Sequence, residues 1–112
     1  MTRPLPVDLQ ADHRRLVLDI LRAHLPERAE TWVFGSRATG RARWNSDLDL
    51  VIDAGRRLTL DEIAELVEAF SDSDLPYKVD LVDWHDIDDR WRQTIAAERA
   101  TLADTPDSDA TG

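Results

Sequence analysis

Residues 31–53 read TWVFGSRATGRARWNSDLDLVID, two apolar segments separated by a polar one. The first apolar segment, residues 32–34, consists of residues that favour β-strands, and it stops at Gly35, which tolerates backbone angles that other residues avoid. The second, residues 48–52, is apolar except for Asp49. The pattern therefore predicts a strand, a tight Gly-Ser turn, a loop and a second strand.

Two acids accompany the second of these strands. Asp47 and Asp49 are two residues apart, and because successive strand side chains point to opposite faces, we expect both carboxylates on one face. Their Cα atoms would lie roughly 7 Å apart. Two like charges on an apolar strand repel each other and lose hydration, so a cation is needed to compensate them. Mg²⁺ is the natural candidate, because it prefers oxygen ligands and is often shared between carboxylates and substrate phosphates.

The loop over residues 35–46 contains three arginines and no acid, whereas the whole chain has a net charge of −9. Gly35 allows a ligand to approach the backbone closely, Ser36 offers a hydroxyl, and the guanidinium group of Arg37 suits phosphate oxygens. We therefore interpret Gly35, Ser36 and Arg37 as candidate nucleotide-binding residues. Metal-holding acids beside such a loop indicate nucleotide chemistry.

Three further loop residues stay open at this stage. Arg41 and Arg43 are weaker phosphate candidates, because a solvated loop arginine explains them equally well. Trp44 could stack on a purine, although packing is favoured because a large aromatic side chain covers apolar surface without any ligand.

A third acid, Asp80, lies within residues 77–82, whose alternating apolar pattern predicts a third strand. A partly exposed edge strand would explain this acid without any function. We favour a third metal ligand, because a two-metal site needs ligands from more than one direction. The Asp-x-Asp spacing by itself is weak, since it recurs in polar segments at 72–74, 86–88 and 107–109.

Gly35-Ser36, followed by ten residues and then Asp47-Leu48-Asp49, resembles the signature of the DNA polymerase β-type nucleotidyltransferase superfamily. The Gly-Ser-Arg-Ala-x-Gly form and the short chain resemble its minimal nucleotidyltransferase branch, many members of which are antitoxins encoded beside HEPN-domain ribonuclease toxins. The resemblance covers about residues 7–100. Many relatives have Arg where this chain has Thr39, which puts one possible phosphate contact in doubt.

The resemblance implies a site and a reaction. Asp47, Asp49 and Asp80 would be the catalytic residues and the ligands of two Mg²⁺ ions, with ATP as the substrate. The reaction would transfer AMP to a hydroxyl, with tyrosine the expected acceptor, of a cognate HEPN toxin. The toxin would be neutralised, and the two proteins would form a hetero-oligomer.

Two alternatives remain open. The chain could be a non-catalytic antitoxin that blocks the toxin by binding, or a small-molecule nucleotidyltransferase of the aminoglycoside-modifying type. The short chain leaves little length for a domain that binds a small acceptor, which counts against the second alternative. The residues themselves do not fix the acceptor, the nucleotide base, the number of nucleotides transferred or the oligomeric state.

The composition limits the other classes of function. A pI of about 4.6 argues against direct nucleic-acid binding, which needs a basic surface, and the absence of cysteine excludes disulfides and zinc–thiolate sites. No apolar run approaches membrane-spanning length and no signal segment opens the chain, so a cytoplasmic protein is expected. We expect a flexible N-terminus over residues 1–6, one domain over residues 7–102 and an acidic, disordered tail over residues 103–112.

The remaining elements follow from helical spacing. A helix is predicted from about Asp8 to Leu25, and a second one over residues 60–70 after the capping-box pair Thr59 and Glu62. A last helix, capped by Asp86 or Asp88, would use four apolar residues as its core face: Ile87, Trp91, Ile95 and Leu102. The order of elements predicts a small α/β nucleotidyltransferase fold, with a mixed sheet of about three or more strands flanked by α-helices.

Overall fold

The structure is a computed structural model that describes residues 9–102 except for residues 27, 41 and 44. It has an α/β fold, as predicted. The elements in chain order are α1 (Ala11–His24), β1 (Glu30–Phe34), α2 (Ser36–Thr39), β2 (Leu48–Asp53), α3 (Leu60–Ser71), β3 (Val79–Asp83), the 3₁₀ helix η1 (Trp84–Asp86), α4 (Asp89–Glu98) and β4 (Ala100–Thr101).

Four strands form one mixed sheet in the order β3-β2-β1-β4. β1 is antiparallel to both of its neighbours, whereas β2 and β3 are parallel. Parallel neighbours need a long crossover connection, and α3 supplies it between β2 and β3. The prediction of a mixed sheet flanked by helices is therefore confirmed.

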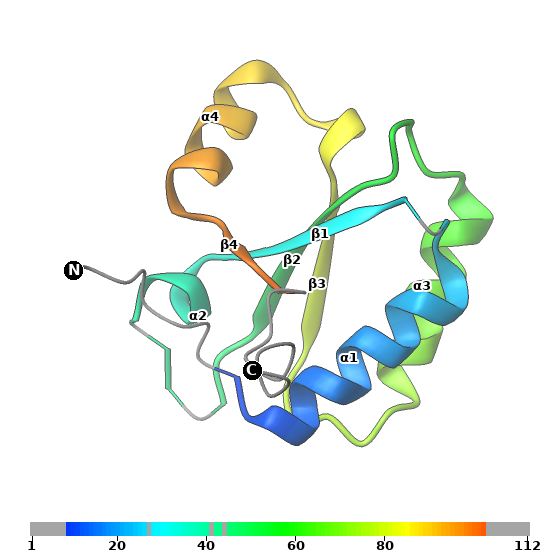
Figure 1. Ribbon diagram of the computed structural model, residues 1–112, viewed down its shortest axis with the longest axis vertical. Coiled ribbons are helices and arrows are strands. Elements are labelled where there is room, and N and C mark those ends of the chain that lie inside the picture. The colour runs from blue at the N-terminus through cyan, green and yellow to red at the C-terminus, as the bar shows by residue number, and fades with distance from the viewer. Residues whose placement is uncertain (1–8, 27, 41, 44, 103–112) are drawn as a thin grey trace, which may run out of the picture.

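The two faces of the sheet differ in what covers them. Leu48, Leu50 and Ile52 alternate along β2 and belong to the main core cluster, together with residues of α1 and α3 such as Val17 and Leu66. Figure 1 shows α1 and α3 side by side against the sheet, and α4 lies apart from them. Asp49 and Asp80 occupy the alternate positions of their strands, so they belong to the face opposite α1 and α3.

Local polar contacts fix where two of the helices begin. The Thr59 hydroxyl accepts a hydrogen bond from the Glu62 N–H (3.1 Å), and the Glu62 carboxylate accepts one from the Thr59 N–H (2.8 Å). This confirms the predicted capping box. Asp88 caps α4 by accepting from the Trp91 N–H at 2.9 Å, which selects Asp88 from the two predicted caps.

Several sequence-based expectations need correction. β3 begins at Val79 and not at residue 77, and neither the four-residue α2 nor the two-residue β4 was anticipated. Trp91 was expected in the core but is 54% exposed. Leu102 is buried, but it follows β4 and does not belong to α4. Helix spacing placed both residues on one face because it could not show that the chain turns back into the sheet after Glu98.

Some expectations concern residues that the structure does not describe. These are the N-terminal segment 1–6, the start of the first helix at Asp8, the tail 103–112, and the loop residues Arg41 and Trp44. Among the described residues, no helix combines the length and the apolar character needed to cross a membrane.

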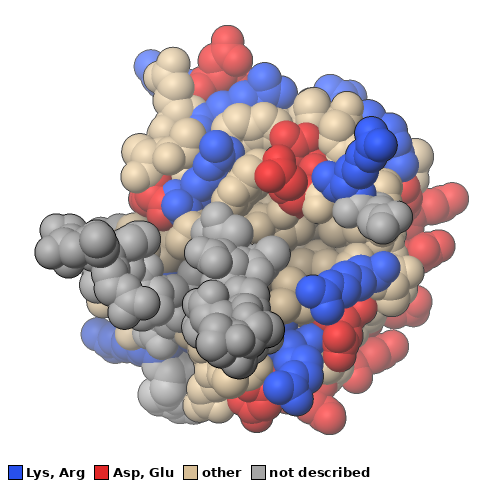
Figure 2. All heavy atoms as spheres, in the orientation of Figure 1, with Lys and Arg blue, Asp and Glu red and all other residues tan. Residues whose placement is uncertain are grey.

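Acidic side chains are concentrated on one part of the surface. In the space-filling view they gather along the right-hand edge, where α1 and α3 lie in Figure 1 (Figure 2). Glu65 and Glu68 of α3 are exposed, as the helical spacing predicted. These acids therefore need no functional interpretation, unlike the two acids within the sheet.

Candidate functional site

Asp49 and Asp80 face each other across two parallel strands. They are direct partners in the register of β2 and β3, so their side chains leave the sheet on the same face. Burial, then the negative charges of Asp80 and Asp47, then a hydrogen bond with Asp80 and the charge of Glu98, raise the pKa of Asp49 to about 6. Two carboxylates held together at this spacing form a centre of negative charge that favours a cation or a proton.

Gly35 lies directly against Asp49 because of the register of β1 and β2. Phe34, the last residue of β1, pairs with Asp49, so the chain turns beside the Asp49 carboxylate. Gly35 has a φ of 74°, which side-chain-bearing residues rarely adopt. A Cβ atom at this position would clash with Oδ2 of Asp49 and lie 3.3 Å from its Cγ. The glycine is therefore required both by its backbone angle and by the space that Asp49 occupies.

Asp47 lies directly before β2 and not within the strand, and it is exposed. Its charge nevertheless contributes to the raised pKa of Asp49, which places it within electrostatic reach. Among the described residues, no three His, Cys, Asp or Glu side chains form a ready-made metal site. The structure thus brings Asp49 and Asp80 together and leaves Asp47 at the solvent-facing edge of the same site.

Ser36 and Arg37 begin the short helix α2, which follows the Gly35 turn. Ser36 is half-buried, whereas Arg37 is only 5% exposed. The Arg37 guanidinium donates two hydrogen bonds to the Ser46 carbonyl, from Nε at 3.1 Å and from Nη2 at 2.7 Å. It also lies 4.1 Å from the centre of the Tyr77 ring. Arg37 therefore ties α2 to the residue that immediately precedes Asp47, a role that phosphate-binding chemistry did not suggest.

Other charged groups near the site interact more weakly. Lys78 Nζ lies 3.7 Å from Asp80 Oδ1, but the two side chains are 74% and 42% exposed, so solvent screens the pair. Arg43 is exposed, and its backbone N–H donates to the Ser46 hydroxyl at 2.7 Å. These contacts leave the paired carboxylates of Asp49 and Asp80 as the dominant electrostatic feature.

One residue at the site was missed by the sequence analysis. Glu98, the last residue of α4, accepts a hydrogen bond from the Gly35 N–H at 3.0 Å through its Oε1. The two residues are 63 positions apart. Glu98 is one of 23 acids in the chain, and no local pattern distinguishes it from the others.

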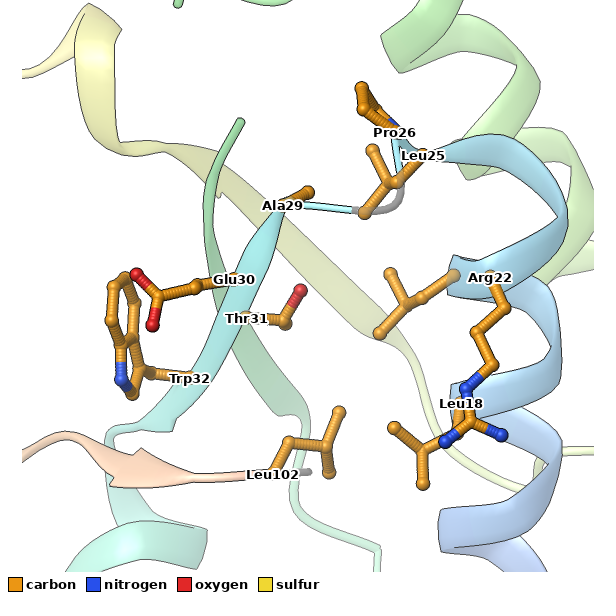
Figure 3. A pocket seen from close by; sticks show the side chains of 10 residues that line it. Leu18, Arg22, Leu25, Pro26, Ala29, Glu30, Thr31, Trp32 and Leu102 are labelled. Atoms are coloured by element: carbon orange, nitrogen blue, oxygen red, sulfur yellow. The ribbon is translucent and has the colours of Figure 1, made fainter. Parts of the chain in front are cut away.

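A separate cavity of about 580 Å³ lies between α1 and β1. Leu18 of α1 and Leu25, which follows the end of that helix, line it together with Thr31 and Leu102, whereas Trp32 and Glu30 point to the other side of β1 (Figure 3). Trp32 pairs with Val51, which shares a face of the sheet with Asp49. The cavity therefore opens on the face opposite the carboxylates, and none of the predicted site residues lines it.

Residues 18–108 match the family model described as polymerase beta, nucleotidyltransferase. The chain belongs to this family. The resemblance inferred from the Gly-Ser and Asp-x-Asp spacing is thereby confirmed. Among curated proteins, this chain is 39% identical over 95 residues to the "Probable protein adenylyltransferase MntA" of Haemophilus influenzae. The match spans 85% of this chain and 82% of that relative.

Solved structures agree with this family assignment. A toxin-antitoxin crystal structure with AMP-PNP matches with a TM-score of 0.70 at 26% identity, covering 88% of this chain and 78% of the other. A complex of a tri-AMPylated HEPN toxin from Shewanella oneidensis with its MNT antitoxin matches with a TM-score of 0.63 at 23% identity, covering 88% and 75%. The second likeness concerns the fold alone.

Proposed function

We propose that this chain is a magnesium-dependent nucleotidyltransferase that acts as an antitoxin in the cytoplasm. It transfers AMP from ATP to a hydroxyl, with tyrosine the expected acceptor, of a cognate HEPN toxin and forms a hetero-oligomer with that toxin. The observation that carries the proposal is the pairing of Asp49 with Asp80 on parallel strands, with the Gly35 turn packed against Asp49. The adenylyltransferase relative and the toxin-antitoxin structures support the acceptor and the partner.

The donor set at the site fits Mg²⁺. Asp49 and Asp80 offer hard carboxylate oxygens, and burial together with the neighbouring negative charge of Asp80 raises the pKa of Asp49, which is the expected result when like charges meet without a compensating cation. Asp47 is exposed at the edge of this pair and completes the proposed ligand set. Bound there, two Mg²⁺ ions would supply activation of the attacking hydroxyl and charge stabilisation of the triphosphate.

The chain's own residues would orient the two substrates. The turn at Gly35 and Ser36 lets the triphosphate approach the backbone, and Arg37 holds the adjacent loop in place. The acceptor hydroxyl oxygen forms a bond to the α-phosphorus of ATP as the bond to the bridging oxygen breaks. Pyrophosphate leaves with the bonding electron pair, and the hydroxyl proton passes to the Asp80 carboxylate and then to solvent. Positioning and charge stabilisation account for most of the rate.

Rescue of toxin-expressing cells tests this function. The wild-type chain is expected to restore growth, and the double substitution Asp47→Asn and Asp49→Asn is expected to abolish rescue. Because Asn keeps the size of Asp, binding of the toxin should survive, which co-elution of the two proteins would measure. Full rescue by the double variant would show that binding alone neutralises the toxin. Label from ATP on an aminoglycoside and not on the toxin would indicate a small-molecule enzyme.

A further inference from the structure

The contact between Glu98 and Gly35 joins the end of α4 to the turn beside the paired carboxylates. Glu98 Oε1 accepts from the Gly35 N–H at 3.0 Å. The Gly35 carbonyl also has partners, all of them in α2. It accepts hydrogen bonds from the Thr39 hydroxyl at 3.0 Å and from the Ala38 and Thr39 N–H groups at 3.1 Å each. Both polar backbone groups of Gly35 are therefore bound within the protein.

The position of Glu98 is electrostatically unfavourable. It is the last residue of α4, where the helix dipole disfavours negative charge. A carboxylate at this helix end therefore lowers the stability of the helix unless another contact compensates for it. The hydrogen bond to Gly35 is a contact that offsets this cost.

The next residue holds this end of α4 against the sheet. The Arg99 guanidinium lies 4.1 Å from the centre of the Trp32 ring on β1 and 5.1 Å from that of Trp84. Trp32 lies two residues before Phe34, on the same face of β1. Glu98 is thus presented to the Gly35 turn from a helix end that is itself anchored on the strand leading into that turn.

We propose that Glu98 is a positioning residue for nucleotidyl transfer: its carboxylate holds the Gly35 N–H and so keeps the turn pressed against Asp49. This inference rests on the proposed function. The Glu98 contact also determines which groups of the turn remain to bind the triphosphate. The Gly35 N–H is already bound to Glu98, so Gly35 contributes through its lack of a side chain and Ser36 carries the polar contact.

Substitutions at Glu98 separate this role from a merely structural one. Glu98→Gln keeps an acceptor oxygen for the Gly35 N–H and removes the charge, whereas Glu98→Ala removes the acceptor. Glu65→Ala is the matched control, because Glu65 is an exposed glutamate of α3 on the opposite side of the sheet. The readouts are the hydrogen-exchange rate of the Gly35 amide, measured by NMR, and the KM for ATP and kcat of toxin AMPylation.

We expect Glu98→Ala to speed exchange of the Gly35 amide about tenfold or more, because the acceptor of the Gly35 N–H is lost. The same variant should raise the KM for ATP and lower kcat/KM about tenfold or more, because misplacement of the turn misplaces the triphosphate. Glu98→Gln and Glu65→Ala should stay within about threefold of the wild type in both readouts. A lower fraction of folded protein would reduce kcat while leaving the KM for ATP unchanged.

Three results would overturn the assignment of Glu98. These are an unchanged Gly35 exchange rate in Glu98→Ala, an unchanged KM for ATP in that variant, or a loss in Glu98→Gln equal to that in Glu98→Ala, which would make the charge and not the contact responsible. A wild-type chain that transfers no nucleotide contradicts the proposed function instead. The amide measurement needs no activity, so it still tests the Glu98 contact in that case.

Discussion

Asp49 is the residue at which burial, neighbouring charge and backbone packing meet. Asp80 faces it from β3, Asp47 precedes it, and the Gly35 turn leaves no room for a Cβ atom beside its carboxylate. Its pKa is raised to about 6, above the ordinary value of 3.8. The folded state therefore binds a proton at Asp49 more strongly than the unfolded state does.

This difference makes stability depend on pH in a defined direction. The favourable contribution of protonated Asp49 is fully present below its ordinary pKa of 3.8 and is lost as the pH rises through about 6. Without metal, Asp49→Asn should therefore raise the melting temperature by a few degrees at about pH 8, equivalent to roughly 1 kcal/mol after allowance for solvent screening. The gain should vanish below about pH 4. Asp19→Asn, at an exposed control position on α1, should leave the melting temperature unchanged at both pH values.

Thermal unfolding across this pH range checks the prediction, with magnesium removed by a chelator. A melting temperature that Asp49→Asn lowers at every pH would mean that the Asp49 carboxylate stabilises the fold and is not under electrostatic strain. The same variant should lose nucleotidyl transfer in the presence of Mg²⁺, because a neutral amide is a weaker ligand than a carboxylate.

Gly35 allows a second test, with Gly55 as its matched control. Both have positive φ angles, 74° and 80°, but a Cβ at Gly35 would clash with Asp49, whereas nothing lies within 4 Å of one at Gly55. Each Gly→Ala change should cost roughly 1–3 kcal/mol for the backbone angle. Gly35→Ala should cost more and abolish transfer, and Gly55→Ala should keep activity. Urea unfolding measures the loss of stability in each variant, and the transfer rate measures its activity. Equal losses of stability and activity in the two variants would contradict the close approach of Gly35 to Asp49.

At the scale of elements, the short helix α2 connects the Gly35 turn to the loop before β2. Arg37 makes this connection, because its guanidinium binds the Ser46 carbonyl and stacks on Tyr77. It was expected to contact phosphate. Its burial supports the interpretation that it positions Asp47 by holding the loop.

Arg37→Lys distinguishes these two roles. Lysine cannot reproduce two parallel donors or the planar stack, so the folded state should lose about 1–2 kcal/mol. Arg43→Lys, at an exposed loop position, should have almost no effect. Chemical unfolding gives the stability, and nucleotide titration gives the affinity for ATP. A weaker affinity at unchanged stability would instead indicate a direct phosphate contact.

At the scale of the whole molecule, the sequence predicted the features that local patterns specify. The strand before Gly35, the capping box at Thr59 and the apolar alternation of β2 each follow from neighbouring residues. The approach of Asp80 to Asp49 was anticipated because a two-metal site needs ligands from more than one direction, and the family resemblance supported it. Local patterns therefore predicted most of the sheet, whereas the meeting of its two inner acids was predicted from the chemistry expected of the site.

The features that were missed depend on distant contacts. β4 has two residues and exists through its pairing with β1, and α2 is shorter than the helical repeat needed to recognise it. Trp91 has the spacing of a core residue, yet it is exposed, because spacing alone does not show which face of a helix the rest of the fold covers. Glu98 reaches Gly35 across 63 positions, and its neighbours in sequence carry no sign of that contact.

The central claim is that carboxylates on neighbouring strands catalyse nucleotidyl transfer to a protein partner. Incubation of the chain with its cognate HEPN toxin, ATP and Mg²⁺, followed by intact-mass measurement of the toxin, tests this most directly. We predict a gain of one or more AMP units on the toxin, which is absent with Asp49→Asn or without Mg²⁺. An unchanged toxin mass under conditions in which both proteins are folded and bound to each other would contradict the account.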